Sequence, residues 1–147
     1  MTRLGSMQRL ADKEAARLGI PTKLTVRWSG GDCRCTGRSL AHAHVSSDRK
    51  GTICVKHPAT DWRNTIRHEV AHFGPKGGTI NHGSAAFLKA RAKQGDRISK
   101  QRLVVMGLRR CPGHEWNIIE RKETKVTSRG LLRLYKAYCR KCGKEIG

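Results

Sequence analysis

The sequence predicts an α+β fold, in which a helix, a small antiparallel sheet and two further helices precede a C-terminal hairpin. Three observations carry this prediction. An amphipathic helical segment bearing two histidines occupies residues 62–73. Short segments of alternating apolar residues, typical of half-buried strands, lie before it. Near the C-terminus, paired cysteine and histidine residues bracket strand-like sequence, which is typical of a small hairpin held by a metal.

The N-terminal part supplies a helix and the sheet. Apolar residues recur at helical spacing through residues 4–18, and Gly19 ends the pattern, so this helix serves packing. Residues 23–28 alternate between apolar and polar and predict a strand. Residues 33–45 and 52–56 predict the remaining strands, which we expect to be antiparallel.

The central motif is His68-Glu69-Val70-Ala71-His72. Positions i and i+4 share one face of a helix, so His68 and His72 can bind one zinc ion. Glu69 can then accept a proton from water at the metal. The alternative is an amphipathic helix whose two histidines only face water. The helix has an apolar back suited to packing on a core, formed by Trp62, Ile66, Val70 and Phe73.

The boundaries of this helix and a third ligand can also be proposed. Thr60 or Asp61 is a suitable N-cap, and Gly74-Pro75 ends the helix. His82 follows a turn-rich loop and precedes a helical run over residues 84–93, which places it to complete a three-histidine site. Gly78 stands where the metzincin pattern requires histidine, which excludes that class.

These residues resemble the SprT-like (Spartan) metalloproteases, whose HExxH helix is followed by a His-Gly segment and a phenylalanine, here His82-Gly83 and Phe87. The resemblance spans about residues 20–147 and implies a zincin-like minimal metalloprotease domain. It implies zinc ligation by His68, His72 and His82, with Glu69 as catalytic base. It also implies DNA-bound or DNA-crosslinked protein substrates, and a sheet-edge strand beside the cleft. The spacer between His72 and His82 is shorter than in most members.

The charge of the chain predicts a polyanionic partner. Its 147 residues include 31 Lys and Arg against 11 Asp and Glu, a net charge of +20. So basic a protein is expected to bind nucleic acid; the alternative is a merely solvated basic surface. Only 37% of residues are hydrophobic, so the core is modest and bound metal is expected to add stability.

The sequence favours a reducing compartment, cytoplasmic or nucleoid/nuclear, without secretion or membrane insertion. No apolar run approaches the roughly 20 residues that span a bilayer. Residues 1–20 lack an apolar signal core and carry Asp12 and Glu14. Six cysteines in such a compartment indicate metal binding or free thiols rather than disulfides.

A second soft-ligand pattern lies in the sheet region. Cys33-x-Cys35 and His42-x-His44 each place two ligands on one face of a strand. The spacing is unlike that of zinc knuckles, and buried cysteines often only pack. These residues therefore form either a metal site or ordinary packing contacts, and Cys54 is expected to be a core residue.

The C-terminal ligands predict a zinc ribbon. Cys111-Pro112-Gly113-His114 and Cys139-Arg140-Lys141-Cys142 are separated by 24 residues. Residues 116–119 and 131–138 would form the hairpin. Four filled positions leave the zinc no open site, so its role is structural, and so small a module should fold only with metal. We therefore expect two zinc ions, one catalytic and one structural.

The expected domains are residues 1–94 (metalloprotease), 95–110 (basic linker) and 111–147 (zinc ribbon). Linker and ribbon combine cations with aromatic residues, which suits sequence-independent DNA binding through phosphates and unpaired bases. Trp116, Tyr135 and Tyr138 could equally form the ribbon core. The expected DNA contacts are Lys100, Arg102, Arg109, Arg110, Arg121, Lys122, Lys125, Arg129, Arg133 and Lys136.

Two functions fit these observations. The first is a zinc-dependent endopeptidase that acts on DNA-associated proteins. The second is a non-catalytic nucleic-acid-binding zinc-ribbon protein in which every zinc is structural. Glu69 favours the first, because a structural site has no need of a carboxylate beside its ligand.

Overall fold

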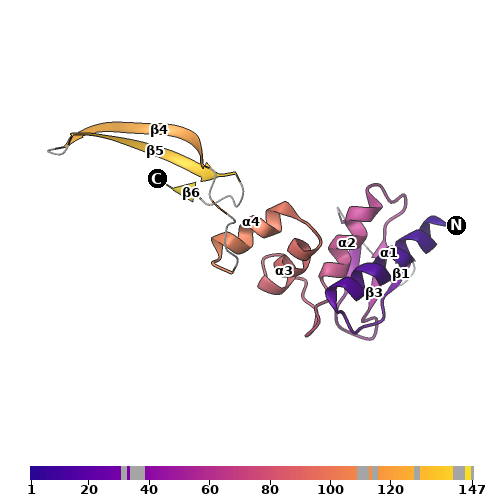
Figure 1. Ribbon diagram of the computed structural model, residues 1–147. Helices are drawn as coiled ribbons and strands as arrows, with labels where there is room; N and C mark the ends of the chain where they lie inside the picture. Colours follow the sequence, from indigo (N-terminus) through magenta and orange to yellow (C-terminus); the bar gives the residue numbers. More distant parts are fainter. Residues whose placement is uncertain are drawn as a thin grey trace. The chain divides into compact units, whose positions relative to one another are not determined.

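The computed structural model describes residues 1–30, 33, 39–108, 113, 116–127, 130–140 and 145–146. The chain divides into two compact units, Met1–Asp96 and Arg97–Gly147. Figure 1 shows the helices and strands, coloured from the N-terminus to the C-terminus.

The first unit is α+β, as the sequence predicts. Helix α1 precedes a three-stranded sheet, and α2 and α3 follow it. The elements are α1 (Arg3–Leu18), β1 (Thr25–Trp28), β2 (Ala41–His44), β3 (Thr52–Val55), α2 (Trp62–Ala71) and α3 (Ala85–Lys93).

Helix α1 begins and ends at well-formed caps. The Thr2 hydroxyl accepts a hydrogen bond from the Gly5 backbone N–H at 3.1 Å. Gly19 adopts φ 69°, a left-handed conformation that suits glycine, and so ends the helix. Met7 and Ala11 are fully buried on the inner face. Glu14 is also buried, and its carboxylate lies 3.6 Å from Nε of Arg67 on α2, so an ion pair joins the two helices.

The sheet has the order β1-β3-β2 and is mixed, which corrects the expected antiparallel sheet. β2 pairs antiparallel with β3, whereas β1 pairs parallel with β3. Alternating apolar residues report which face of a strand is buried but carry no information on strand direction. Because β3 lies between the other two strands, β2 is left at one edge.

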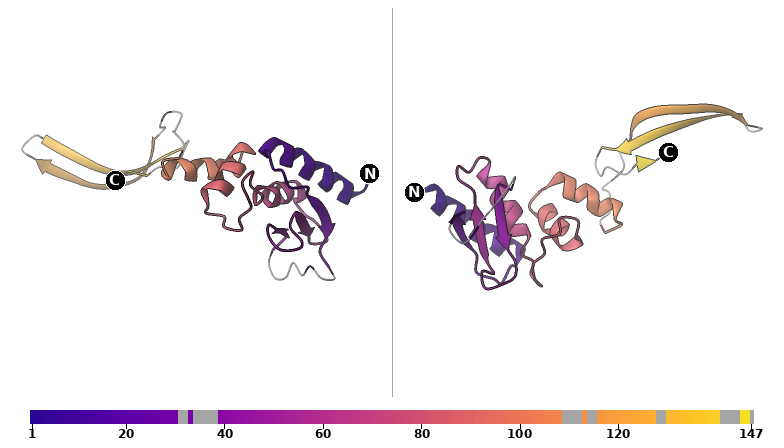
Figure 2. Two further views of the ribbon diagram at one scale, coloured as in Figure 1. Left: turned by 90° about the horizontal axis from the view of Figure 1, so that it is seen from below. Right: turned by 180° about the vertical axis from the view of Figure 1, so that it is seen from behind.

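The two faces of the sheet differ in chemistry. Val26, Ala43 and Ile53 belong to the hydrophobic core, together with residues of α1 and α2. The register pairs His42 with Cys54 across β2 and β3, and successive side chains on a strand alternate. His42, His44 and Cys54 therefore lie on the face away from the core. Figure 2 shows the helices and sheet from two further directions.

Helix α2 carries the central motif and packs its apolar side inward. Ile66 and Val70 are completely buried in the core. The helix ends at Ala71, earlier than the Gly74-Pro75 pair suggests, so His72 is its C-cap residue. Asp61 is the N-cap, as expected, but its side chain makes no capping hydrogen bond.

Replacing Ile66 by alanine is expected to destabilise the first unit by about 2–5 kcal/mol, because a fully buried side chain leaves a cavity. Urea unfolding followed by circular dichroism measures this change. Ile80 is 68% exposed in the same unit, so Ile80→Ala should change the free energy of unfolding by less than about 0.5 kcal/mol. Equal losses in both variants would contradict the placement of Ile66.

The second unit contains α4 (Arg97–Val105), β4 (Trp116–Thr127), β5 (Gly130–Cys139) and β6 (Glu145–Ile146). These strands form one antiparallel sheet of order β4-β5-β6. α4 occupies most of residues 95–110, for which the sequence predicts a basic linker and no separate helix. Within the described ranges, no helix is long and apolar enough to cross a membrane.

Candidate metal centre

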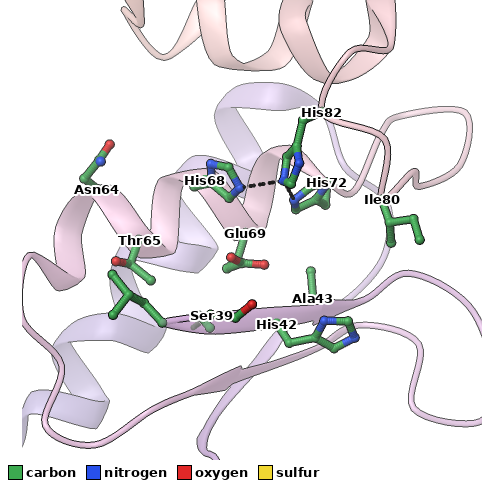
Figure 3. A pocket seen from close by; sticks show the side chains of 12 residues that line it. Ser39, His42, Ala43, Asn64, Thr65, His68, Glu69, His72, Ile80 and His82 are labelled. Carbon is green, nitrogen blue, oxygen red and sulfur yellow. Dashed lines mark hydrogen bonds between the residues drawn. The ribbon is translucent and has the colours of Figure 1, made fainter. Parts of the chain in front are cut away.

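His68 and His72 of the central motif meet the downstream His82 at one point. His68 lies on α2, His72 is its C-cap residue, and His82 precedes α3. Nε2 of His82 lies 3.0 Å from Nε2 of His68 and 3.1 Å from Nε2 of His72. Figure 3 shows the three rings turned toward one another.

This geometry suits a zinc ion. Tetrahedral zinc with Zn–N bonds of about 2.0–2.1 Å places its ligand nitrogens roughly 3.3 Å apart. The ligand atoms of His68, His72 and His82 all lie within 4.8 Å of one another. The three residues are therefore a candidate metal-binding group.

A backbone hydrogen bond orients His72. Its Nδ1 lies 2.7 Å from the carbonyl oxygen of Thr79 and donates to it, which leaves Nε2 as the acceptor available to a metal. The Thr79 N–H returns a bond to the His72 carbonyl at 2.8 Å. Between them, Gly78 passes so close to Val45, the residue after β2, that a Cβ there would lie 2.6 Å from Cβ of Val45. This position accepts no side chain.

Phe87 supports all three rings. Its helix, α3, begins at Ser84, whose hydroxyl accepts from the Phe87 N–H at 3.2 Å. The Phe87 ring stacks on His72 at 4.6 Å between centroids and meets His68 and His82 edge-on at 5.2 and 5.1 Å. The cap thus fixes the start of α3, and the ring closes one side of the centre.

The surroundings keep two of the imidazoles neutral. Burial, followed by repulsion from His72 and His82, lowers the pKa of His68 from 6.5 to about 4. Burial also lowers the pKa of His72, although its bond to Thr79 opposes the shift. Neutral imidazoles are the form that binds metal.

Glu69 is the acidic group beside the triad. It is 7% exposed, and burial raises its pKa from 4.5 to about 7, while a backbone hydrogen bond with Ala43 opposes the shift. A carboxylate with a pKa near neutrality is suited to accept and return a proton. In Figure 3, Glu69 lies between α2 and β2, below the three rings.

The centre opens into a pocket of about 370 Å³ between α2 and the edge strand. His68, Glu69, His72 and His82 line one side of it. Residues 39–43, including most of β2, line the other side. β2 is thus an edge strand of the three-stranded sheet that borders the pocket.

A second group of ligands lies on the other face of the sheet. The ligand atoms of Cys33, His44 and Cys54 also lie within 4.8 Å of one another. Cys54 is fully buried, as expected, but it belongs to this group. Cys33 and Cys54 form a disulfide, in contrast to the expectation of reduced cysteines. Cys35 is outside the described residues, and the His42 ring packs edge-on against that of His44.

The ribbon ligands stay a prediction. Cys111, His114 and Cys142 lie outside the described residues, whereas Cys139 is buried at the end of β5. Among the expected DNA contacts, α4 carries two, β4 three and β5 two. In chain order these are Lys100, Arg102, Arg121, Lys122, Lys125, Arg133 and Lys136. Arg109, Arg110 and Arg129 lie outside the described residues.

Three residues contribute to these two sites in ways that the sequence does not predict. Thr79 and Ala43 act through backbone groups, which leave no signal in the side-chain pattern. Cys54 follows from strand register, since it pairs with His42, one residue of the pattern already noted. The sequence places Cys54 in a strand, but only the register of that strand shows which residues lie beside it.

Comparison of the chain with protein-family models, with curated proteins and with solved structures finds no match.

Proposed function

We propose that this protein is a zinc-dependent endopeptidase of the SprT-like kind that acts on DNA-bound or DNA-crosslinked proteins. The observation that carries the proposal is the convergence of His68, His72 and His82 beside Glu69 in an open pocket. A site that is only structural would be closed by a fourth protein ligand and would have no use for an adjacent carboxylate.

The three imidazoles would bind the zinc ion, and Glu69 would act as the general base and acid. Zinc in such a site supplies a Lewis acid for the scissile carbonyl and lowers the pKa of water. Glu69 would accept the proton of the attacking water and pass it to the leaving amine. Its raised pKa favours this exchange near neutral pH.

The edge strand is proposed to hold the substrate backbone. β2 is the outer strand of the sheet beside the pocket, and Ala41 and Ala43 line that pocket. An extended peptide could pair with this edge through main-chain hydrogen bonds, which select for an unfolded segment rather than a sequence. Small side chains at these positions leave space for the substrate.

DNA association would supply selectivity. The net charge of +20 favours binding to phosphates, and enzyme and substrate would then meet on one polymer. Selectivity would then come from co-localisation on DNA more than from a deep specificity pocket. The second unit carries seven of the expected basic contacts on α4, β4 and β5.

The direct experiment is a cleavage assay on a basic DNA-binding protein, with and without DNA. We expect zinc-dependent fragments that appear faster with DNA and vanish after chelation with 1,10-phenanthroline. A protein that binds DNA and zinc but cleaves nothing, under all these conditions, would favour the non-catalytic zinc-ribbon function.

Binding to DNA is expected to be steeply salt-dependent and indifferent to sequence. Contacts to about five phosphates give a slope of log K against log salt of about −4 or steeper. Fluorescence anisotropy with two unrelated oligonucleotides measures both properties. Lys122→Glu/Lys125→Glu should weaken binding more than Arg9→Glu/Lys13→Glu, an equal charge change at exposed positions of α1. Equal losses would contradict a role for β4.

A further inference from the structure

Cys33, His44 and Cys54 form a compact soft-ligand cluster on the face of the sheet away from the core. Nε2 of His44 lies 3.1 Å from Sγ of Cys33 and 3.6 Å from Sγ of Cys54. Tetrahedral zinc with Zn–S bonds of about 2.3 Å and a Zn–N bond of about 2.0 Å sets sulfur and nitrogen roughly 3.5 Å apart. Both nitrogen–sulfur distances therefore match those of a zinc site, in which the two sulfur atoms would no longer be bonded to each other.

Three separate segments supply the ligands, and backbone pairing holds each one. His44 and Cys54 lie on the neighbouring strands β2 and β3. Cys33 forms an isolated bridge with Gly30, through hydrogen bonds of 3.0 and 3.1 Å in both directions. Their placement thus depends on main-chain contacts as well as on the disulfide.

We propose that, when both thiols are reduced, Cys33, His44 and Cys54 bind one zinc ion. Two thiolates and an imidazole favour zinc over hard cations such as magnesium or calcium. Cys33 is 2% exposed and Cys54 is fully buried. Thiolates buried away from water need a compensating positive charge. The ion supplies that charge.

Zinc binding and the disulfide are mutually exclusive, because both use the same two sulfur atoms. In the zinc-bound form, one ion would tie the segment before β2 to β2 and β3. The opposite face of β2 presents Ala41 and Ala43 to the pocket. The ion would therefore brace the strand that borders the candidate metal centre, without taking part in its chemistry.

The test is zinc content per chain in the full-length protein, purified with zinc and tris(2-carboxyethyl)phosphine and measured by mass spectrometry of the metal. Cys33→Ser/Cys54→Ser and His44→Ala should each lose one zinc equivalent relative to the parent. His57→Ala, at an exposed histidine outside both clusters, should lose none. Unchanged zinc content in the double-cysteine variant would overturn the proposal.

A second measurement on the parent chain avoids any folding defect of the variants. In the reduced protein, zinc should protect Cys33 and Cys54 from N-ethylmaleimide, and chelation should expose both to alkylation. Recovery of the two residues as a disulfide-linked peptide from reduced, zinc-loaded protein would overturn the proposal. So would alkylation at the same rate with and without zinc. Neither result depends on peptidase activity.

Discussion

Glu69→Gln is expected to lower the rate of peptide-bond cleavage by about 10²–10⁴-fold, the range associated with a positioned general base. Glutamine has the same shape and can still accept the hydrogen bond from Ala43, but it cannot take a proton. Zinc and DNA binding should be unchanged, since neither uses this side chain. The measurement is single-turnover cleavage of a DNA-bound protein, with zinc content and DNA affinity determined on the same preparation.

A second buried carboxylate provides the control. Glu14 is 2% exposed on α1 and pairs with Arg67 rather than facing the pocket. Glu14→Gln also removes a buried negative charge, so it should preserve cleavage even if it lowers stability. Full activity of Glu69→Gln would end the endopeptidase proposal, and equal loss in both variants would trace the effect to folding.

His82→Ala is expected to abolish cleavage through loss of metal. Two histidines at i and i+4 would remain, and two ligands bind zinc far more weakly than three. The loss of affinity should exceed the roughly 10–100-fold associated with removal of an outer-shell partner. Dialysis against a weak chelator, followed by zinc determination, should show one equivalent fewer than in the parent.

The matched control is His42→Ala. His42 lines the same pocket but lies outside the three-histidine group, so its removal should leave the zinc content unchanged. Retention of a full zinc equivalent by His82→Ala, after the same dialysis, would contradict its role as third ligand. In that event a group other than His82 would be the third ligand beside His68 and His72. The proposed open coordination position would then have no support.

Much of the candidate centre could be anticipated because its signals are local. The i, i+4 spacing of His68 and His72 depends only on helical geometry, and the apolar positions of Ile66 and Val70 fix which side of the helix is buried. The approach of His82 to the other two histidines is predicted from the length of the loop and from the resemblance to the SprT-like family. The loop that delivers it is closed by two hydrogen bonds between His72 and Thr79. One runs from the His72 ring to the Thr79 carbonyl, and the other from the Thr79 N–H to the His72 carbonyl.

The α+β class, the ligand-bearing helix with its buried apolar side and the strongly basic character of the chain all follow from the order of the residues. These depend on periodicity and composition, which are properties of neighbouring residues. Three other features became visible in the folded chain: the parallel pairing of β1 with β3, the edge position of β2 beside Glu69, and the meeting of Cys33, His44 and Cys54. Each of these depends on strand order and register, and contacts between distant segments leave no periodic trace in one sequence.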